Sequence, residues 1–182
     1  MSDDASRQEE WVGAVLERYE RALLNYALRF TGNLEAARDV VQDTFLQLCQ
    51  ADRARIDGHM AAWLYTVCRN RALDVRKKEG RMEGLAERQE QLQACPAPGP
   101  SVRAEQNETH AMVLAALETL PEREQEVFRL KFQDGLSYRE IGQVLGMPHT
   151  TVSLHVHTAL QTIRERLRAC AVLTPERQGL TP

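Results

Sequence analysis

Apolar residues recur every three or four positions along the first half of the chain, which is the spacing of a single helix face. They form three blocks, over residues 11–30, 34–48 and about 59–73. Between the first two blocks, residues 31–33 (Thr-Gly-Asn) combine a helix-ending glycine with an N-capping residue. Asp57 stands near the start of the third block as its cap. The pattern predicts three helices packed into one compact domain.

A different pattern occupies residues 136–152. Ser137 followed three residues later by Glu140 is a capping box, so a helix is predicted to begin at Tyr138. Gly146 can take the left-handed conformation that ends this helix, and Pro148 is tolerated at the opening of the next one.

The apolar positions complete this second unit. The first of its helices is predicted to bury Ile141, Val144 and Leu145, while Gly142 leaves room for the second helix to cross closely. The second is predicted to bury Val152, Val156 and Ile163. The spacing predicts a helix-turn-helix, whose second helix usually enters the DNA major groove. A short helical corner without a DNA role is the alternative.

The composition favours two small helical domains, because only 5% of the residues are aromatic while 43% are hydrophobic. The fold class predicted is all-α, with a three- to four-helix domain over 1–82 and a helix-turn-helix domain over 107–170. A flexible linker over 83–106 and a tail over 171–182 complete the chain. Prolines in the linker prevent a continuous helix.

The net charge of −3 comes from the middle of the chain. Residues 79–110 hold 3 basic and 6 acidic side chains, whereas the segments on either side are balanced. The only concentrated basic patch is carried by the polar side of the third block and comprises Arg69, Arg71, Arg76, Lys77 and Lys78, with Arg81 following. Trp63, Tyr65 and Asn70 add stacking surface and an amide, which suits single-stranded or distorted nucleic acid. Attraction of cations to a helix C-terminus is the structural alternative.

Four scattered cysteines, at positions 49, 68, 95 and 170, lack the paired spacing of a zinc site or a disulfide framework. We expect reduced thiols, no metal and no cofactor. The acidic N-terminus and the lack of a long apolar run predict neither a secretory signal nor membrane insertion, and therefore a cytoplasmic protein.

Three segments resemble bacterial extracytoplasmic-function sigma factors of the sigma-70 family. Residues 28–46 are similar to region 2, including an Asp-x-x-Gln-x-x-Phe core that begins at Asp39, and residues 61–74 resemble its Ala-Trp-Leu-Tyr and Arg-Asn-x-Ala-Leu-Asp signature. Residues 117–141 resemble region 4. The resemblance implies an alternative sigma factor that binds core RNA polymerase and directs promoter-specific initiation. Catalysis then belongs to the polymerase, so the chain itself is expected to be no enzyme.

The resemblance also implies roles for particular residues. Asp39, Gln42 and Asp43 would dock on the clamp helices of the polymerase β′ subunit, and the β subunit would be a further contact. Asn70 would help to hold a base pulled from the promoter −10 element. The remaining −10 contacts would be phosphate contacts by Arg69, Arg71, Arg76, Lys77 and Lys78. Trp63 would pack in the core.

The second helix of the helix-turn-helix departs from the family pattern. After Pro148 the first Arg or Lys is Arg164, so phosphate anchoring at the −35 element should be weak. His155 and His157 can hydrogen-bond bases, but at i and i+2 they do not face each other and do not form a metal pair. The predicted −35 contacts are Ser137, Tyr138, Arg139, His149, Thr150, Thr151, Ser153, Leu154, His155, His157 and Thr158.

Two other classes of protein remain open. A sigma-like decoy for an anti-sigma factor would explain a poorly basic recognition helix. A conventional helix-turn-helix regulator would leave residues 28–81 unexplained. A regulator would usually bind DNA as a dimer. A sigma factor is expected to act as one copy per polymerase, with promoter DNA and an anti-sigma protein as its other partners.

Overall fold

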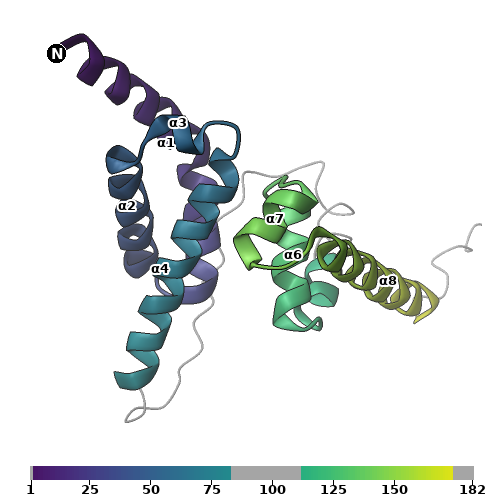
Figure 1. Cartoon of the computed structure of the whole chain (residues 1–182). Helices are drawn as coiled ribbons and strands as arrows, with labels where there is room; N and C mark the ends of the chain where they lie inside the picture. Colours follow the sequence, from purple (N-terminus) through teal and green to yellow (C-terminus); the bar gives the residue numbers. More distant parts are fainter. Residues whose placement is uncertain (1, 83–111, 174–182) are drawn as a thin grey trace, which may run out of the picture. The chain divides into compact units, whose positions relative to one another are not determined.

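The structure is a computed structural model that describes residues 2–82 and 112–173 of the 182-residue chain (Figure 1). All regular structure within these two ranges is helical, which confirms the all-α fold class. The chain divides into two compact units. Below, the helices of residues 2–82 are called the N-terminal unit and the helices of residues 112–173 the C-terminal unit. The predicted linker over 83–106, Cys95 and most of the tail lie outside the described residues, so the domain boundaries stay predictions.

The N-terminal unit is built on three helices, α1 (Ser2–Thr31), α2 (Leu34–Gln50) and α4 (Met60–Met82), each of which contacts the other two. Their shared core contains Leu23, Tyr26 and Ala27 of α1, Val40, Thr44 and Leu48 of α2, and Leu64, Tyr65 and Cys68 of α4, all of them 2% exposed or less. The three blocks of the sequence pattern therefore correspond to the three packed helices.

The turn between α1 and α2 forms as its residues predict. Gly32 has φ +64, a conformation that side chains disfavour. The Oδ1 atom of Asn33 accepts hydrogen bonds from the amides of Glu35 at 2.8 Å and Ala36 at 3.4 Å. Asn33 is thus the N-cap of α2.

The prediction for Asp57 is wrong. Asp57 does not cap α4 but ends a short helix, α3 (Arg53–Ile56), where its amide donates to the carbonyl of Arg53 at 3.0 Å. The side chain of Asp52 caps the start of α3, and Gly58 with φ +86 reverses the chain before α4. Four residues are too short for a periodic apolar pattern, so α3 left no signal in the sequence.

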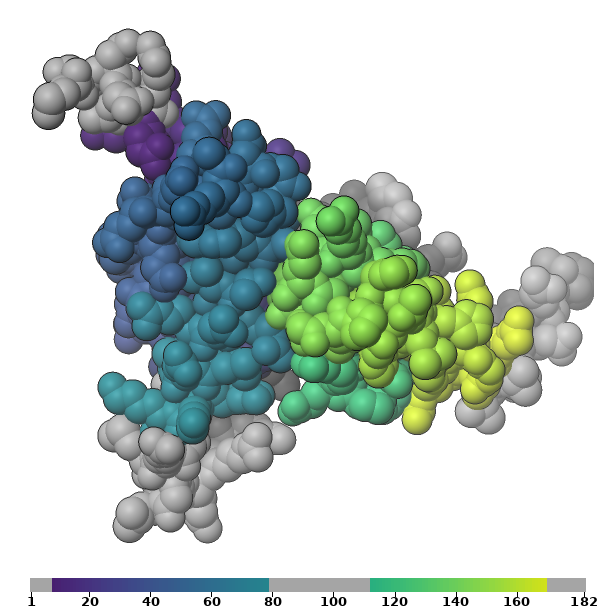
Figure 2. All heavy atoms as spheres, in the orientation of Figure 1, coloured from purple at the N-terminus to yellow at the C-terminus, as the bar shows by residue number. Residues whose placement is uncertain are grey.

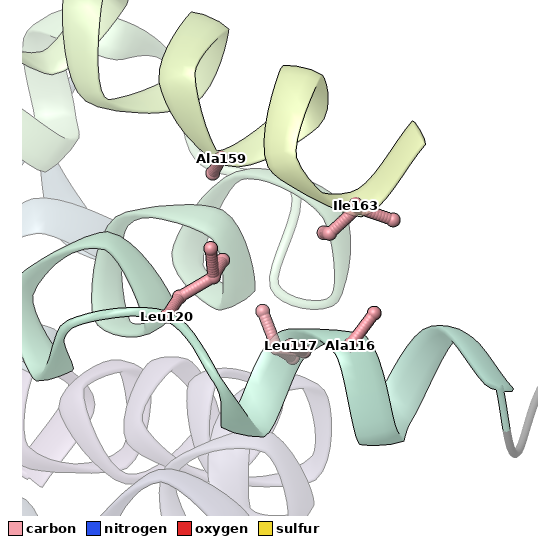
Figure 3. Close-up of a cluster of buried hydrophobic side chains, with 5 residues drawn as sticks. All are labelled: Ala116, Leu117, Leu120, Ala159 and Ile163. Carbon is pink, nitrogen blue, oxygen red and sulfur yellow. The ribbon is translucent and has the colours of Figure 1, made fainter. Parts of the chain in front are cut away.

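The C-terminal unit contains a helix over 112–118, followed by α6 (Glu122–Phe132), α7 (Tyr138–Leu145) and α8 (His149–Leu173). Figure 3 shows Ala116, Leu117 and Leu120 pointing toward Ala159 and Ile163 of α8, all 5% exposed or less. Phe128 and Leu167 are partly buried against this cluster. The cluster anchors the middle of α8. The first turns of α8, before the cluster, form the second helix of the helix-turn-helix.

Candidate nucleic-acid and protein interfaces

Three polar side chains of α2 form one solvent-facing row. Asp39, Gln42 and Asp43 are exposed, while Phe45 is only 6% exposed and belongs to the core. Leu46, 53% exposed, lies three residues after Asp43 and extends the same row. The sequence reasoning missed Leu46, although its place outside the apolar stripe of α2 could have indicated it. An exposed leucine beside carboxylates and an amide suits a protein partner.

The basic residues of the third block lie along α4, which continues beyond Leu73 to Met82. Asn70, Arg71, Arg76, Lys77 and Lys78 are exposed, and Arg69 is half-buried. The guanidinium of Arg76 also lies 5.8 Å from the ring centroid of Phe30, so part of its side chain covers the core. The structure therefore presents this basic patch to solvent on one helix.

Tyr65 is not part of this surface, which corrects the prediction that it adds stacking area for bases. It is 1% exposed, and its ring meets the ring of Tyr26 edge to face with centroids 5.1 Å apart. Trp63 is half-buried. Asn70 is thus the exposed member of the predicted mixture of aromatic and amide groups.

The polar row on α2 and the basic patch on α4 meet at an ion pair between Asp43 and Arg71. Nε of Arg71 lies 3.9 Å from Oδ2 of Asp43, with the two side chains 47% and 50% exposed. In the space-filling view, atoms of α2 and α4 are adjacent on the face shown (Figure 2). Exposed pairs of this kind contribute little stability, about 0–1 kcal/mol, because water screens them. The pair joins a residue predicted to bind polymerase to a residue predicted to bind DNA.

The helix-turn-helix has the geometry that its spacing predicts. The carboxylate of Glu140 accepts from the amide of Ser137 at 2.8 Å and from its hydroxyl at 2.6 Å. The amide of Glu140 donates back to Oγ of Ser137 at 3.3 Å, which completes the capping box. Gly146 has φ +63 and ends α7. The carbonyl of Pro148 accepts the first bonds of α8.

Gly142 is needed for the turn that leads into α8. A Cβ atom on this residue would lie 2.7 Å from the carbonyl oxygen of Met147, and the amide of Met147 donates to the carbonyl of Gly142 at 2.9 Å. The sequence predicts a close approach at this glycine, and the structure has one. The backbone of Gly142 lies against the turn that precedes the second helix.

Buried and exposed residues recur at helical spacing along α8, so the helix has a core side and a solvent side. The predicted core residues Val152, Val156 and Ile163 are 0%, 2% and 5% exposed. The exposed members of the predicted −35 contacts are Ser137, Tyr138, Arg139, His149, Thr150, Ser153, Leu154, His157 and Thr158, and Thr151 and His155 are half-buried.

His155 has a side-chain partner on another helix of the C-terminal unit. Its Nδ1 atom lies 4.0 Å from Oε1 of Glu124 in the first turn of α6, and the two side chains are 28% and 15% exposed. His157 lies two residues on and is exposed. The structure therefore leaves His157 available for DNA and gives His155 a partner within the chain.

Burial determines the chemistry of Cys68. Desolvation raises the pKa of its thiol from 9.0 to about 12, although a hydrogen bond with Thr44 opposes the shift. The Sγ atom lies 3.8 Å from the carbonyl of Leu23, to which it donates. A neutral buried thiol is a packing group, while Cys49 on α2 is exposed.

Across the two described ranges, His, Cys, Asp and Glu side chains form no group of three able to hold a metal ion. In the same ranges, each helix is too short or too polar to cross a bilayer.

Comparisons with known proteins match both units. Residues 15–82 match the family "Sigma-70 region 2", and residues 110–163 match "Sigma-70, region 4". The chain is 30% identical over 166 residues to the ECF RNA polymerase sigma factor SigE of Mycolicibacterium smegmatis, covering 90% of this chain and 64% of that protein.

Two further relatives and a solved structure agree. SigL of Mycobacterium tuberculosis, another ECF sigma factor, is 29% identical over 94% of this chain and 97% of its own length. SigW of Bacillus subtilis is 26% identical, over 85% and 87%. The sigma factor RpoE of Bartonella quintana, solved with the anti-sigma factor NepR, shares the fold with a TM-score of 0.65 at 23% identity, over 86% of this chain and 96% of that one.

Proposed function

The chain belongs to the extracytoplasmic-function sigma factors of the sigma-70 family, and from this membership we propose that it binds core RNA polymerase and directs initiation at particular promoters. The observation that carries the proposal is the presence of regions 2 and 4, in that order, in one chain. A conventional helix-turn-helix regulator would leave the match over residues 15–82 without a role. In this proposal the polymerase performs the catalysis, and the chain works where the polymerase does, in the cytoplasm.

The polymerase-binding surface proposed is the row on α2, directed at the β′ clamp helices. Its support is that Asp39, Gln42 and Asp43 all face solvent from one side of a helix whose opposite side is anchored in the core. Such anchoring fixes the backbone that carries these side chains, so docking of the partner costs little backbone freedom. Leu46 adds an apolar contact to the same surface.

The promoter −10 element is proposed to bind α4. Asn70 is exposed and can hydrogen-bond the edge of an extruded base, and the cations Lys77 and Lys78 can pair with phosphates of the displaced strand. Extrusion costs a few kcal/mol, which these contacts must offset. The carboxylate of Asp43 would compete with a phosphate for the guanidinium of Arg71.

The promoter −35 element is proposed to bind the exposed side of α8 and the start of α7. The geometric support is the capped helix-turn-helix, which presents the first turns of α8 to solvent. An anti-sigma protein is proposed as a further partner, since the fold matches a sigma factor solved in such a complex.

The test is co-migration of the purified chain with bacterial core RNA polymerase on a sizing column, using wild type and a variant carrying Asp39→Ala and Gln42→Ala. A matched control carries Glu17→Ala and Glu20→Ala, two exposed acidic positions at the same spacing on α1. We expect binding by wild type and by the control, and loss of binding by the α2 variant. A folded wild-type chain that does not co-migrate would contradict the proposal and favour the decoy or the conventional regulator.

A further inference from the structure

Leu154 is the most exposed large apolar side chain in the described part of the chain. Its side chain is 63% exposed, and it lies in the second turn of α8. Exposing so much of a leucine forgoes the stabilisation that burial would give. The fold of the C-terminal unit does not explain this position, since the core side of α8 is already filled by Val152 and Val156.

The geometry of α8 places Leu154 opposite that core side. It lies two residues from both Val152 and Val156, which is roughly 200° of rotation around a helix. Ala159 and Ile163 continue the buried side toward the C-terminus of α8. Leu154 therefore points away from the domain, at the centre of the face that a recognition helix turns toward a groove.

The neighbours of Leu154 on this face are exposed hydrogen-bonding side chains, including His157 three residues further on. Thr150 precedes it by four residues and Thr158 follows it by four, so each lies one turn away on the same side, and both are exposed. The first Arg or Lys of α8 is Arg164, ten residues further on. The surface is poor in the cations that hold phosphates, so it must obtain more of its binding energy from base edges.

An exposed leucine among threonines complements one base in particular. Thymine alone among the four bases carries a methyl group at C5, and this methyl lies in the major groove. Residues 149–160 of α8 contain no Asp or Glu that would repel DNA, whereas the exposed Leu46 lies beside the carboxylate of Asp43.

We propose that Leu154 contacts the C5-methyl group of a thymine in the −35 element, so that −35 preference in this protein depends on an apolar contact. The inference rests on the proposed function, because it requires α8 to enter the major groove of promoter DNA. Leu154 is then a specificity-determining residue, with the flanking threonines as hydrogen-bonding neighbours.

The test compares thymine with uracil, which pairs identically but lacks the methyl group. Holoenzyme reconstituted from the full chain and core polymerase selects from promoter duplexes randomised across the −35 segment, synthesised with either base in that segment only. We expect thymine to be enriched at one position in the library made with thymine. Uracil should not be enriched at that position in the library made with uracil. In the selected duplex, replacing that thymine by uracil should weaken binding about fourfold, the effect of one buried methyl.

The variant Leu154→Ala should bind thymine and uracil duplexes equally. Leu16→Ala is the matched control, an exposed leucine of α1 in the N-terminal unit, and it should keep the wild-type ratio. The circular dichroism melting curve of each variant checks folding, which an exposed position should not disturb.

Two results would overturn the inference alone. The first is −35 selection by wild type with no difference between thymine and uracil. The second is a Leu154→Ala variant that keeps the wild-type ratio of binding to the thymine and uracil duplexes. That result would overturn the inference even if the variant lost binding to an inhibitor protein. Absence of any −35 selection by a holoenzyme that does form would overturn the −35 part of the proposed function, and this inference with it.

Discussion

Replacing Gly142 by alanine should destabilise the C-terminal unit, although alanine is the better helix former. The added Cβ would lie 2.7 Å from the carbonyl oxygen of Met147, whereas real Cβ contacts below 3.0 Å are essentially never seen. The obstructing atom belongs to the backbone, so no side chain can rotate to relieve the contact. The turn between α7 and α8 has to move instead.

Two effects of opposite sign set the magnitude. Alanine gains about 1 kcal/mol over glycine inside a helix. Forcing extra volume into a packed site costs about 1–3 kcal/mol, and contact with fixed backbone puts Gly142→Ala toward the upper end. We therefore expect a net loss of about 1–2 kcal/mol. In a domain of this size, each kcal/mol lowers the melting temperature by about 4–8 °C.

Gly13 supplies the matched control, because it is also helical and a Cβ atom there would meet nothing within 4 Å. Gly13→Ala should raise stability by up to about 1 kcal/mol. Both tryptophans of the chain, Trp11 and Trp63, lie in the N-terminal unit, so their fluorescence reports that unit. Far-ultraviolet circular dichroism reports the helices of both units.

Thermal melts with the two probes should separate the variants. Gly142→Ala should lower a transition seen by circular dichroism and leave the tryptophan transition unchanged, whereas Gly13→Ala should raise the tryptophan transition. A Gly142→Ala variant that melts at or above the wild-type temperature would refute the reasoning, because it would show that the turn yields without cost.

Four further predictions concern other residues of the two units. Ser137→Ala removes the capping box and should cost the C-terminal unit about 1 kcal/mol, measured by the circular dichroism melt; an unchanged melt would show that the cap contributes nothing. Asn70→Ala should impair promoter opening, measured by permanganate reactivity, more than it impairs polymerase binding, and equal loss of both would contradict the assigned role. Because the folded-state pKa of Cys68 is raised, its contribution to stability is complete below pH 9 and is lost between pH 9 and 12 as the unfolded thiol ionises. Urea unfolding at several pH values should show the free energy of unfolding falling between pH 9 and 12 in wild type, and falling less steeply in Cys68→Ala. Identical dependence on pH in the two proteins would count against the raised pKa of Cys68. His157→Ala should change −35 selection from a randomised library while His155→Ala should change it little, since the latter faces Glu124; the reverse order would refute the assignment.

The local features of this fold could be predicted because neighbours in sequence create them. A capping box joins Ser137 to Glu140, only three residues apart, and Asn33 caps the helix that follows it directly. The glycines at 32 and 146 take positive φ for reasons of backbone sterics alone. Periodicity likewise identified the buried positions of α8, because one helix face contacts one core.

The partners across the core could not be predicted in the same way, because periodicity gives a face of a helix and not what lies opposite it. The sequence pattern places Tyr65 on the surface, yet in the structure it is buried and directly follows the buried Leu64. Since α4 contacts both α1 and α2, its buried stripe is wide enough to include two consecutive residues.

The relations between surfaces were decided by the tertiary structure as well. Asp43 and Arg71 are 28 positions apart, and only the packing of α2 on α4 brings them together. Packing of α6 on α8 turns His155 toward Glu124 and leaves Leu154 facing outward. The sequence by itself determined the main helices of the N-terminal unit, the helix-turn-helix with its capping box and the family, but not α3 or the full length of α4. Packing decided which side chains the protein uses internally and which remain for a partner, because burial and ion pairing depend on distances through space.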